Sequence, residues 1–135
     1  MHEWALAEAV VEAVKQNIEE ADPKDVESVI VLFGELQDVN SEIFQSGLKS
    51  IIEDTPFEHT SFIIEVEPAS FRCNVCSREW TLQSFPNLTK DERESIHFLP
   101  EAAHVYMHCP ECGSPDFIIA KGLGVTIKSI EIVKR

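Results

Sequence analysis

The chain has 135 residues and a mass of 15.2 kDa, a length that excludes a large enzyme with several pockets. Its composition of 44% apolar and 26% charged residues is that of a globular protein and excludes a disordered or fibrous chain. The net charge of −13 comes entirely from residues 1–67, which hold sixteen acidic and three basic side chains, whereas residues 68–135 hold eight of each. An acidic half repels a phosphate backbone, so nucleic acid is a poor partner for that half.

Two amphipathic helices are predicted in the first half of the chain. Apolar residues recur at helical spacing from Leu6 to Ile18, and this helix must end near Pro23 because proline cannot continue a helix. Asn40 can cap a second helix by accepting its first free amide hydrogens, and Phe44 begins the apolar stripe of that helix. Each helix therefore has one face to bury against another layer.

Three strands are predicted outside these helices. The β-branched run 26–33 indicates a buried strand, the alternating run 62–66 indicates a half-covered strand, and residues 125–132 indicate a third. Between the last two strands, residues 70–121 have few periodic apolar runs and hold all the cysteines. We therefore predict an α+β fold of two helices packed on a three-stranded mixed sheet, with an inserted module. The predicted domains are residues 1–69 plus 122–135, and residues 70–121.

The inserted module contains two Cys-x-x-Cys pairs, separated by 32 residues, which are Cys73, Cys76, Cys109 and Cys112. Two such turns present four thiolates to one ion, and this donor set suits zinc in a closed tetrahedron with no position for a substrate. We expect a structural metal in a zinc-ribbon-like module that is too small to hold a core of its own. Free thiols and a redox pair are the alternatives without a metal.

Two other functions fit a four-thiolate module. A single iron can replace zinc and give a rubredoxin-like electron carrier. Four basic residues between positions 72 and 93 leave a nucleic-acid-binding zinc ribbon as the second alternative. The same module also contains acidic residues that cancel this charge locally, which are Glu79, Asp91, Glu92 and Glu94.

The chain shows no feature of a membrane or secreted protein. No run of residues is long and apolar enough to span a bilayer, and the first residues lack the pattern of a secretion signal. We therefore expect a cytoplasmic protein without a membrane partner. Reducing conditions in the cytosol favour a metal site over disulfides for the paired cysteines.

Trp4 and Trp80 are both expected in apolar cores.

A second candidate metal site lies at the start of the chain. The free amine of Met1, the amide nitrogen of His2 and the Nδ1 atom of the His2 imidazole can chelate one ion through fused rings. This arrangement favours planar Ni(II) or Cu(II) over tetrahedral Zn(II). Many chains begin with these two residues without binding a metal, so the residues alone leave this site open.

Three features in this order resemble the HypA/HybF family of nickel-insertion accessory proteins for [NiFe] hydrogenase maturation. They are Met1-His2-Glu3 before an amphipathic helix, Gly34-Glu35-Leu36 at the end of a strand, and the two Cys-x-x-Cys turns. The resemblance covers essentially the whole chain and implies a nickel metallochaperone rather than an enzyme. It implies Ni(II) at Met1 and His2, structural Zn(II) at the four cysteines, and a HypB-type GTPase and the hydrogenase large subunit as partners.

Two further residues are candidates for the nickel site that this resemblance implies. A planar ion with three nitrogens from the chain start has one position left, and His97 is our candidate for it because it lies away from the cysteine turns. We expect His104 to pack on the module surface and His108 to lie near the zinc. Glu3 is a candidate to neutralise or weakly bind the ion, and the alternative is that it only complements the helix dipole.

Overall fold

The structure is a computed structural model that describes residues 2–37 and 39–134. The chain forms two compact units. The first unit consists of Met1–Leu32, Val39–Glu65 and Thr126–Arg135, and the second consists of Phe33–Asp38 and Val66–Val125. Among the described residues, no helix is long and apolar enough to cross a bilayer.

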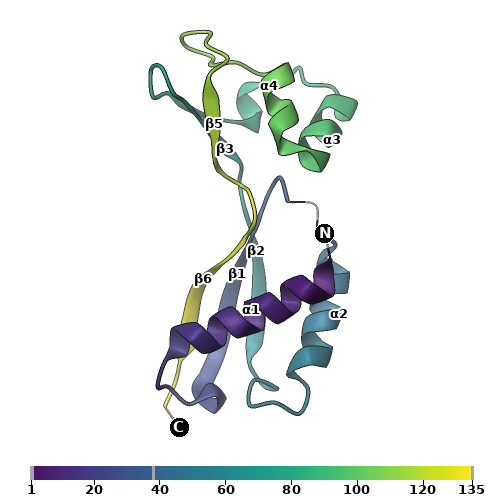
Figure 1. Cartoon of the computed structure of the whole chain (residues 1–135), viewed down its shortest axis with the longest axis vertical. Helices are drawn as coiled ribbons and strands as arrows, with labels where there is room; N and C mark the ends of the chain where they lie inside the picture. Colours follow the sequence, from purple (N-terminus) through teal and green to yellow (C-terminus); the bar gives the residue numbers. More distant parts are fainter. Residues whose placement is uncertain (1, 38, 135) are drawn as a thin grey trace. The chain divides into compact units, whose positions relative to one another are not determined.

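The first unit is built on a three-stranded sheet with strand order β2-β1-β6. The strands are β1 (Val26–Gly34), β2 (Ser61–Glu67) and β6 (Val125–Ile132), and the helices are α1 (Glu3–Ile18) and α2 (Ser41–Ile52). Strands β1 and β2 run in the same direction with α2 as the crossover between them, and β6 runs the opposite way (Figure 1). The predicted mixed sheet and α+β class are confirmed.

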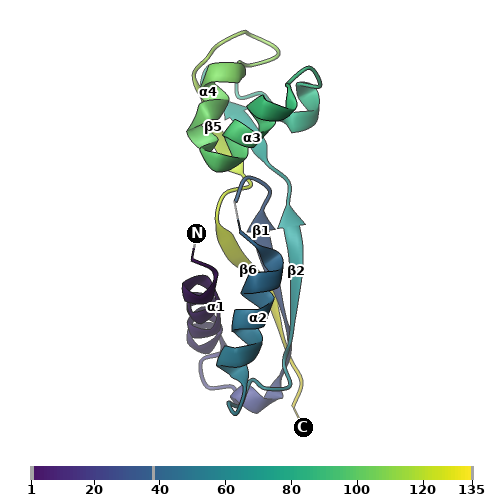
Figure 2. The same ribbon diagram turned by 90° about the vertical axis from the view of Figure 1, so that its right-hand side faces the viewer.

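Both helices cover one face of this sheet (Figure 2). Helix α1 packs against α2 and buries an apolar stripe that includes Val10 and Val14. The middle of β1 supplies the layer beneath, where Val29 and Val31 have no exposed surface. The alternation of these valines with half-buried neighbours shows that one face of β1 is covered more completely than the other.

The helix ends follow local rules that the sequence only partly predicts. The Asn40 side chain accepts a hydrogen bond from the Ile43 N–H at 3.0 Å, which confirms the predicted cap of α2. Helix α1 ends at Ile18, earlier than Pro23 requires, because Glu19 adopts a left-handed backbone with φ 52°. Pro23 instead begins the 3₁₀ turn Pro23–Asp25 that leads into β1.

The second unit contains an antiparallel sheet with strand order β4-β3-β5. The strands are β3 (Ser70–Cys73), β4 (Glu79–Thr81) and β5 (Phe117–Lys121). Two helices, α3 (Lys90–Phe98) and α4 (Ala103–Tyr106), and the 3₁₀ turns Leu82–Ser84 and Pro100–Ala102 lie between β4 and β5. Thr89 and Glu92 form a capping box that begins α3, a Thr-x-x-Glu signal that is visible in the sequence.

The second unit has an apolar core, so the expectation that it is too small to hold one was wrong. Trp80 is 3% exposed, as predicted, and its ring lies 5.9 Å from Phe71 and 5.2 Å from Phe117, centroid to centroid. Helix α3 adds Ile96, which has no exposed surface. The core closes because the long segment between the cysteine pairs folds back as helices over the small sheet.

The loop after β1 belongs to the second unit, although the predicted domains placed it with the helices. Leu36 is 1% exposed within the core around Phe71 and Trp80. The Glu35 carboxylate accepts a hydrogen bond from the Ala69 N–H at 2.8 Å. The loop is therefore fixed to the second unit by both apolar and polar contacts. The division into a nickel-binding domain and a zinc-binding domain stays a prediction.

Candidate metal centres

Four sulfur atoms converge at one place in the second unit. The Sγ atoms of Cys73, Cys76, Cys109 and Cys112 all lie within 4.8 Å of one another. The distances are 3.6 Å from Cys73 to Cys112 and 3.5 Å from Cys76 to Cys109. Zinc–sulfur bonds of about 2.3 Å in a tetrahedron place sulfurs about 3.8 Å apart, so this arrangement fits a zinc ion closely.

Each cysteine pair lies in the same kind of backbone turn. The Cys73 carbonyl accepts a hydrogen bond from the Ser77 N–H at 3.1 Å, and the Cys109 carbonyl accepts one from the Gly113 N–H at 2.9 Å. The fourth residue after each first cysteine has a left-handed backbone, with φ 65° at Ser77 and φ 77° at Gly113. Glycine adopts this conformation without strain, whereas serine does so at a cost of about 1 kcal/mol.

Backbone amides support negative charge on the sulfurs. The N–H groups of Val75 and Cys76 point to the Cys73 sulfur at 3.3 and 3.4 Å, and the Cys112 N–H points to the Cys109 sulfur at 3.5 Å. Cys73 and Cys109 are buried, while Cys76 and Cys112 are exposed. The centre therefore lies at the margin of the second core, with one buried and one exposed thiol from each turn.

The pKa values of Cys109 and Cys76 are shifted in opposite directions. Desolvation raises the pKa of Cys109, but hydrogen bonds from the backbone of Cys112 and Glu111 and from neighbouring thiols lower it to about 6. The Arg78 N–H lowers the pKa of Cys76, but desolvation and thiol hydrogen bonds outweigh it and raise that pKa to about 12. A metal that binds all four sulfurs must therefore displace protons.

The start of α1 holds two of the other predicted ligands, His2 and Glu3. Met1 lies outside the described residues. His2 is the cap of α1, and its Nδ1 atom accepts a hydrogen bond from the Ala5 N–H at 3.4 Å. The Glu3 carboxylate accepts a hydrogen bond from the Asn40 backbone N–H at 3.2 Å, which lowers the pKa of this carboxyl group. This contact ties the first turn of α1 to the cap of α2.

The three histidines of the second unit lie in different surroundings. His97 is half-buried in α3. The His104 ring stacks on Phe117, with centroids 4.2 Å apart, so it packs on the module surface as expected. The His108 ring meets Phe85 edge to face at 5.8 Å. His97 and His2 belong to different units, and the assignment of His97 to the nickel site stays a prediction.

Comparison with known proteins decides the family. Residues 1–132 match the family model described as "Hydrogenase/urease nickel incorporation, metallochaperone, hypA". The hydrogenase maturation factors HypA of Pyrococcus abyssi and Pyrococcus furiosus are 42% and 41% identical over 135 residues, which cover 99% of this chain and 97% of each relative. The chain belongs to the HypA family. The expected resemblance is confirmed.

Solved HypA structures share the fold at lower sequence identity. The solution structure of the Ni metallochaperone HypA from Helicobacter pylori is 20% identical, covers both chains completely and has a TM-score of 0.65. A second structure, titled solution structure of HypA protein, is also 20% identical, covers 98% of this chain and 97% of the other, and has a TM-score of 0.67. HypA membership favours neither the iron carrier nor the nucleic-acid ribbon.

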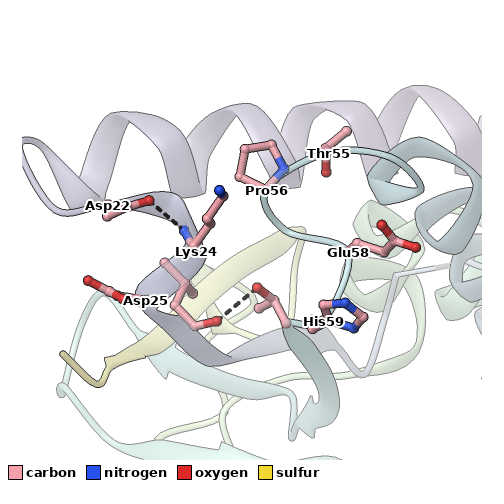
Figure 3. A pocket seen from close by; sticks show the side chains of 9 residues that line it. Asp22, Lys24, Asp25, Thr55, Pro56, Glu58 and His59 are labelled. Atoms are coloured by element: carbon pink, nitrogen blue, oxygen red, sulfur yellow. Dashed lines mark hydrogen bonds between the residues drawn. The ribbon is translucent and has the colours of Figure 1, made fainter. Parts of the chain in front are cut away.

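A cavity of about 510 Å³ in the first unit is lined mainly by polar residues but lacks the geometry of a metal site (Figure 3). Asp22, Asp25, Glu58 and His59 are among its lining residues. The Asp22 carboxylate accepts a hydrogen bond from the Lys24 N–H at 2.9 Å, and Glu58 points away from Asp22. Among the described residues, only the four cysteines bring three or more potential ligands together.

Proposed function

We propose that this chain is a nickel metallochaperone that captures Ni(II) at its amino terminus and delivers it during [NiFe] hydrogenase maturation. The family match over residues 1–132 carries this proposal. The chain makes and breaks no covalent bond of a substrate, so it acts as a carrier and not as an enzyme. It works in the cytoplasm with a HypB-type GTPase and the hydrogenase large subunit, the partners that the HypA resemblance implies.

The nickel ligands are the amine of Met1, the amide nitrogen of His2 and the Nδ1 atom of His2. Nδ1 is already in use as the acceptor of the Ala5 N–H, but the distance of 3.4 Å makes this a weak hydrogen bond that an ion can displace. The positive end of the helix dipole opposes a cation at this position. The Glu3 carboxylate offsets that effect, which supports a neutralising role for this residue. His97 is the candidate for the fourth position.

The structural ion is Zn(II), bound by Cys73, Cys76, Cys109 and Cys112. Sulfur distances of 3.5 and 3.6 Å and the amide contacts to sulfur support this assignment. Four thiolates leave no open position, so zinc stabilises the second unit and takes no part in a reaction. Because two of the ligands belong to the apolar core, we expect removal of zinc to loosen that core.

A short amino-terminal extension tests the nickel site. Residues fused before Met1 convert its amine into an amide, so we expect tight binding of Ni(II) by calorimetry to be lost while one zinc per chain is retained by elemental analysis. His2→Ala should give the same result, and His104→Ala should bind nickel as the wild type does because that ring is engaged with Phe117. Undiminished one-to-one nickel binding by the extended chain would exclude the proposed ligands.

The alternatives have simple tests of their own. An iron carrier would be coloured as purified, whereas a protein with zinc in the thiolate site is colourless. A nucleic-acid ribbon would retard DNA or RNA with a steep salt dependence. We expect neither result. His97→Ala should weaken nickel binding without changing the zinc content, and an unchanged nickel affinity would remove this residue from the site.

A further inference from the structure

A groove of about 430 Å³ lies between helix α2 and strand β2 of the first unit, and we call it the β2 groove. Its apolar lining consists of Leu48, Ile52 and Phe62. Its polar lining consists of Gln45, Ser46, Lys49 and Thr60. The groove therefore combines an apolar surface with a polar rim that comes mainly from α2.

Another side of α2 faces α1. Trp4 lies over Gly47 there, and a Cβ atom placed on Gly47 would come within 3.1 Å of the ring carbons Cγ and Cδ2. Trp4 is 43% exposed, so the expectation of a core position was wrong for this residue. Helix α2 thus contacts α1 on one side and lines the β2 groove on another.

Strand β2 forms the other wall of the groove and is an outer strand of its sheet, whose order is β2-β1-β6. The Glu67 carbonyl accepts a hydrogen bond from the Glu35 N–H at 2.8 Å, so this carbonyl points to the β1 side of the strand. The N–H and carbonyl groups of successive residues point to alternate sides of a strand, so those of Phe62 and Ile64 point to the outer edge. The groove therefore offers main-chain donors and acceptors beside its apolar surface.

The outer edge of β2 lacks the features by which natural proteins prevent the addition of a strand. Residues 61–64 contain no proline and no charged side chain. Glu65 is the first charged residue of the strand, and its carboxylate pairs with the Lys128 ammonium group at 3.0 Å. An open edge of this kind accepts an extended segment of another chain.

Two observations define the occupant of the groove. Lys49 is exposed, and among the described residues no carboxylate lies within ion-pair distance of its ammonium group. Helix α2 lies on the outer side of β2, away from β1 (Figure 1). A second copy that added its own β2 would bring its own α2 into the same space, whereas a single extended segment brings no helix. The groove therefore fits an extended segment that carries a carboxylate for Lys49.

We propose that the β2 groove binds an extended segment of a partner protein, which adds to β2 as a fourth strand of the sheet. Alternate side chains of this segment are apolar and pack on the apolar lining, and one acidic side chain among them pairs with Lys49. Main-chain hydrogen bonds to Phe62 and Ile64 supply affinity, and the side chains supply specificity. The groove contains none of the proposed nickel or zinc ligands, so this inference does not rest on the carrier function.

A capped peptide of seven residues tests the groove by NMR. It has threonine at its odd positions, valine at its second and sixth positions and glutamate at its centre, so it presents the same side chains in either direction. A second peptide carries lysine in place of glutamate. On titration into the full-length labelled chain, the glutamate peptide should shift the amide signals of Phe62 and Ile64 and slow their hydrogen exchange. The Ile63 amide points to β1, so its exchange should stay unchanged.

Two tryptophan substitutions on α2 form a matched pair. Gln45→Trp places a bulky ring in the groove and should reduce affinity for the glutamate peptide about tenfold or more. Ser50→Trp places the same ring about 140° away around the helix, outside the groove lining, and should change that affinity less than about twofold. Lys49→Glu should lower affinity for the glutamate peptide about fivefold and raise affinity for the lysine peptide.

Several results would overturn the proposal. One is that the glutamate peptide at millimolar concentration leaves the Phe62 and Ile64 amides unchanged, and this test needs only the wild type, so it holds even if Gln45→Trp fails to fold. Equal affinity of Gln45→Trp and the wild type would place the peptide elsewhere. Equal affinity for the two peptides would refute the pairing with Lys49. If light scattering shows a dimer that Gln45→Trp dissociates, a second copy occupies the groove and the proposal is wrong.

Discussion

Replacement of Gly34 by alanine should destabilise the second unit by about 4 kcal/mol, because a new Cβ atom would collide with backbone. It would lie 2.2 Å from the Gly122 carbonyl oxygen and 2.7 Å from the Leu123 nitrogen, and neither atom can rotate away. The collision would separate residues 34–36 from residues 122–124. This breaks two backbone hydrogen bonds of 2.9 Å, from the Gly34 N–H to the Gly124 oxygen and from the Leu36 N–H to the Gly122 oxygen. Each contributes about 1 kcal/mol, and exposure of Leu36 adds about 2 kcal/mol.

Urea unfolding monitored by the fluorescence of buried Trp80 measures this loss, because that ring lies in the same core as Leu36. Gly124→Ala is the matched control. Gly124 has φ 75°, but a Cβ atom there would meet nothing within 4 Å, so only the left-handed backbone is penalised, by about 1 kcal/mol. If Gly34→Ala lowers the free energy of unfolding by less than about 1 kcal/mol, the space beside Gly34 admits a methyl group and the predicted collision is refuted.

Three further results are expected. Asn40→Ala should lower the stability of the first unit by about 1 kcal/mol in thermal unfolding, because the side-chain cap of the Ile43 N–H is lost, and an unchanged melting temperature would contradict this. Ser77→Gly should raise the stability of the zinc-loaded second unit by about 1 kcal/mol, since glycine accepts φ 65° without strain, and a loss of stability would argue against that cause. Zinc affinity, measured against a competing chelator, should fall as pH drops from about 7.5 to below about 6. The pKa of Cys76 is about 12 and that of Cys109 is about 6, so below about pH 6 protons compete with zinc even for the Cys109 thiolate. A zinc affinity that does not change over this pH range would exclude thiolate ligands.

The candidate metal-binding residues could be predicted from the sequence where the chemistry is local. Two residues between paired cysteines fix a tight turn, and this spacing alone places Cys73 with Cys76 and Cys109 with Cys112. The convergence of the two pairs into one cluster was a prediction that the structure confirms. The bond between Glu3 and the Asn40 N–H joins residues 37 positions apart, so no sequence period could show it.

Periodicity, capping chemistry and the cysteine spacing determined the helices, the strands of the first unit and the thiolate donor set, because each depends on residues within a few turns of one another. Only the tertiary structure decided that Leu36 enters the second core, that Gly34 passes against Gly122, and that Trp4 lies on Gly47 at the surface. These contacts join segments far apart in the chain. Their partners are chosen by packing and steric fit in the folded state, which a local pattern of residues does not contain.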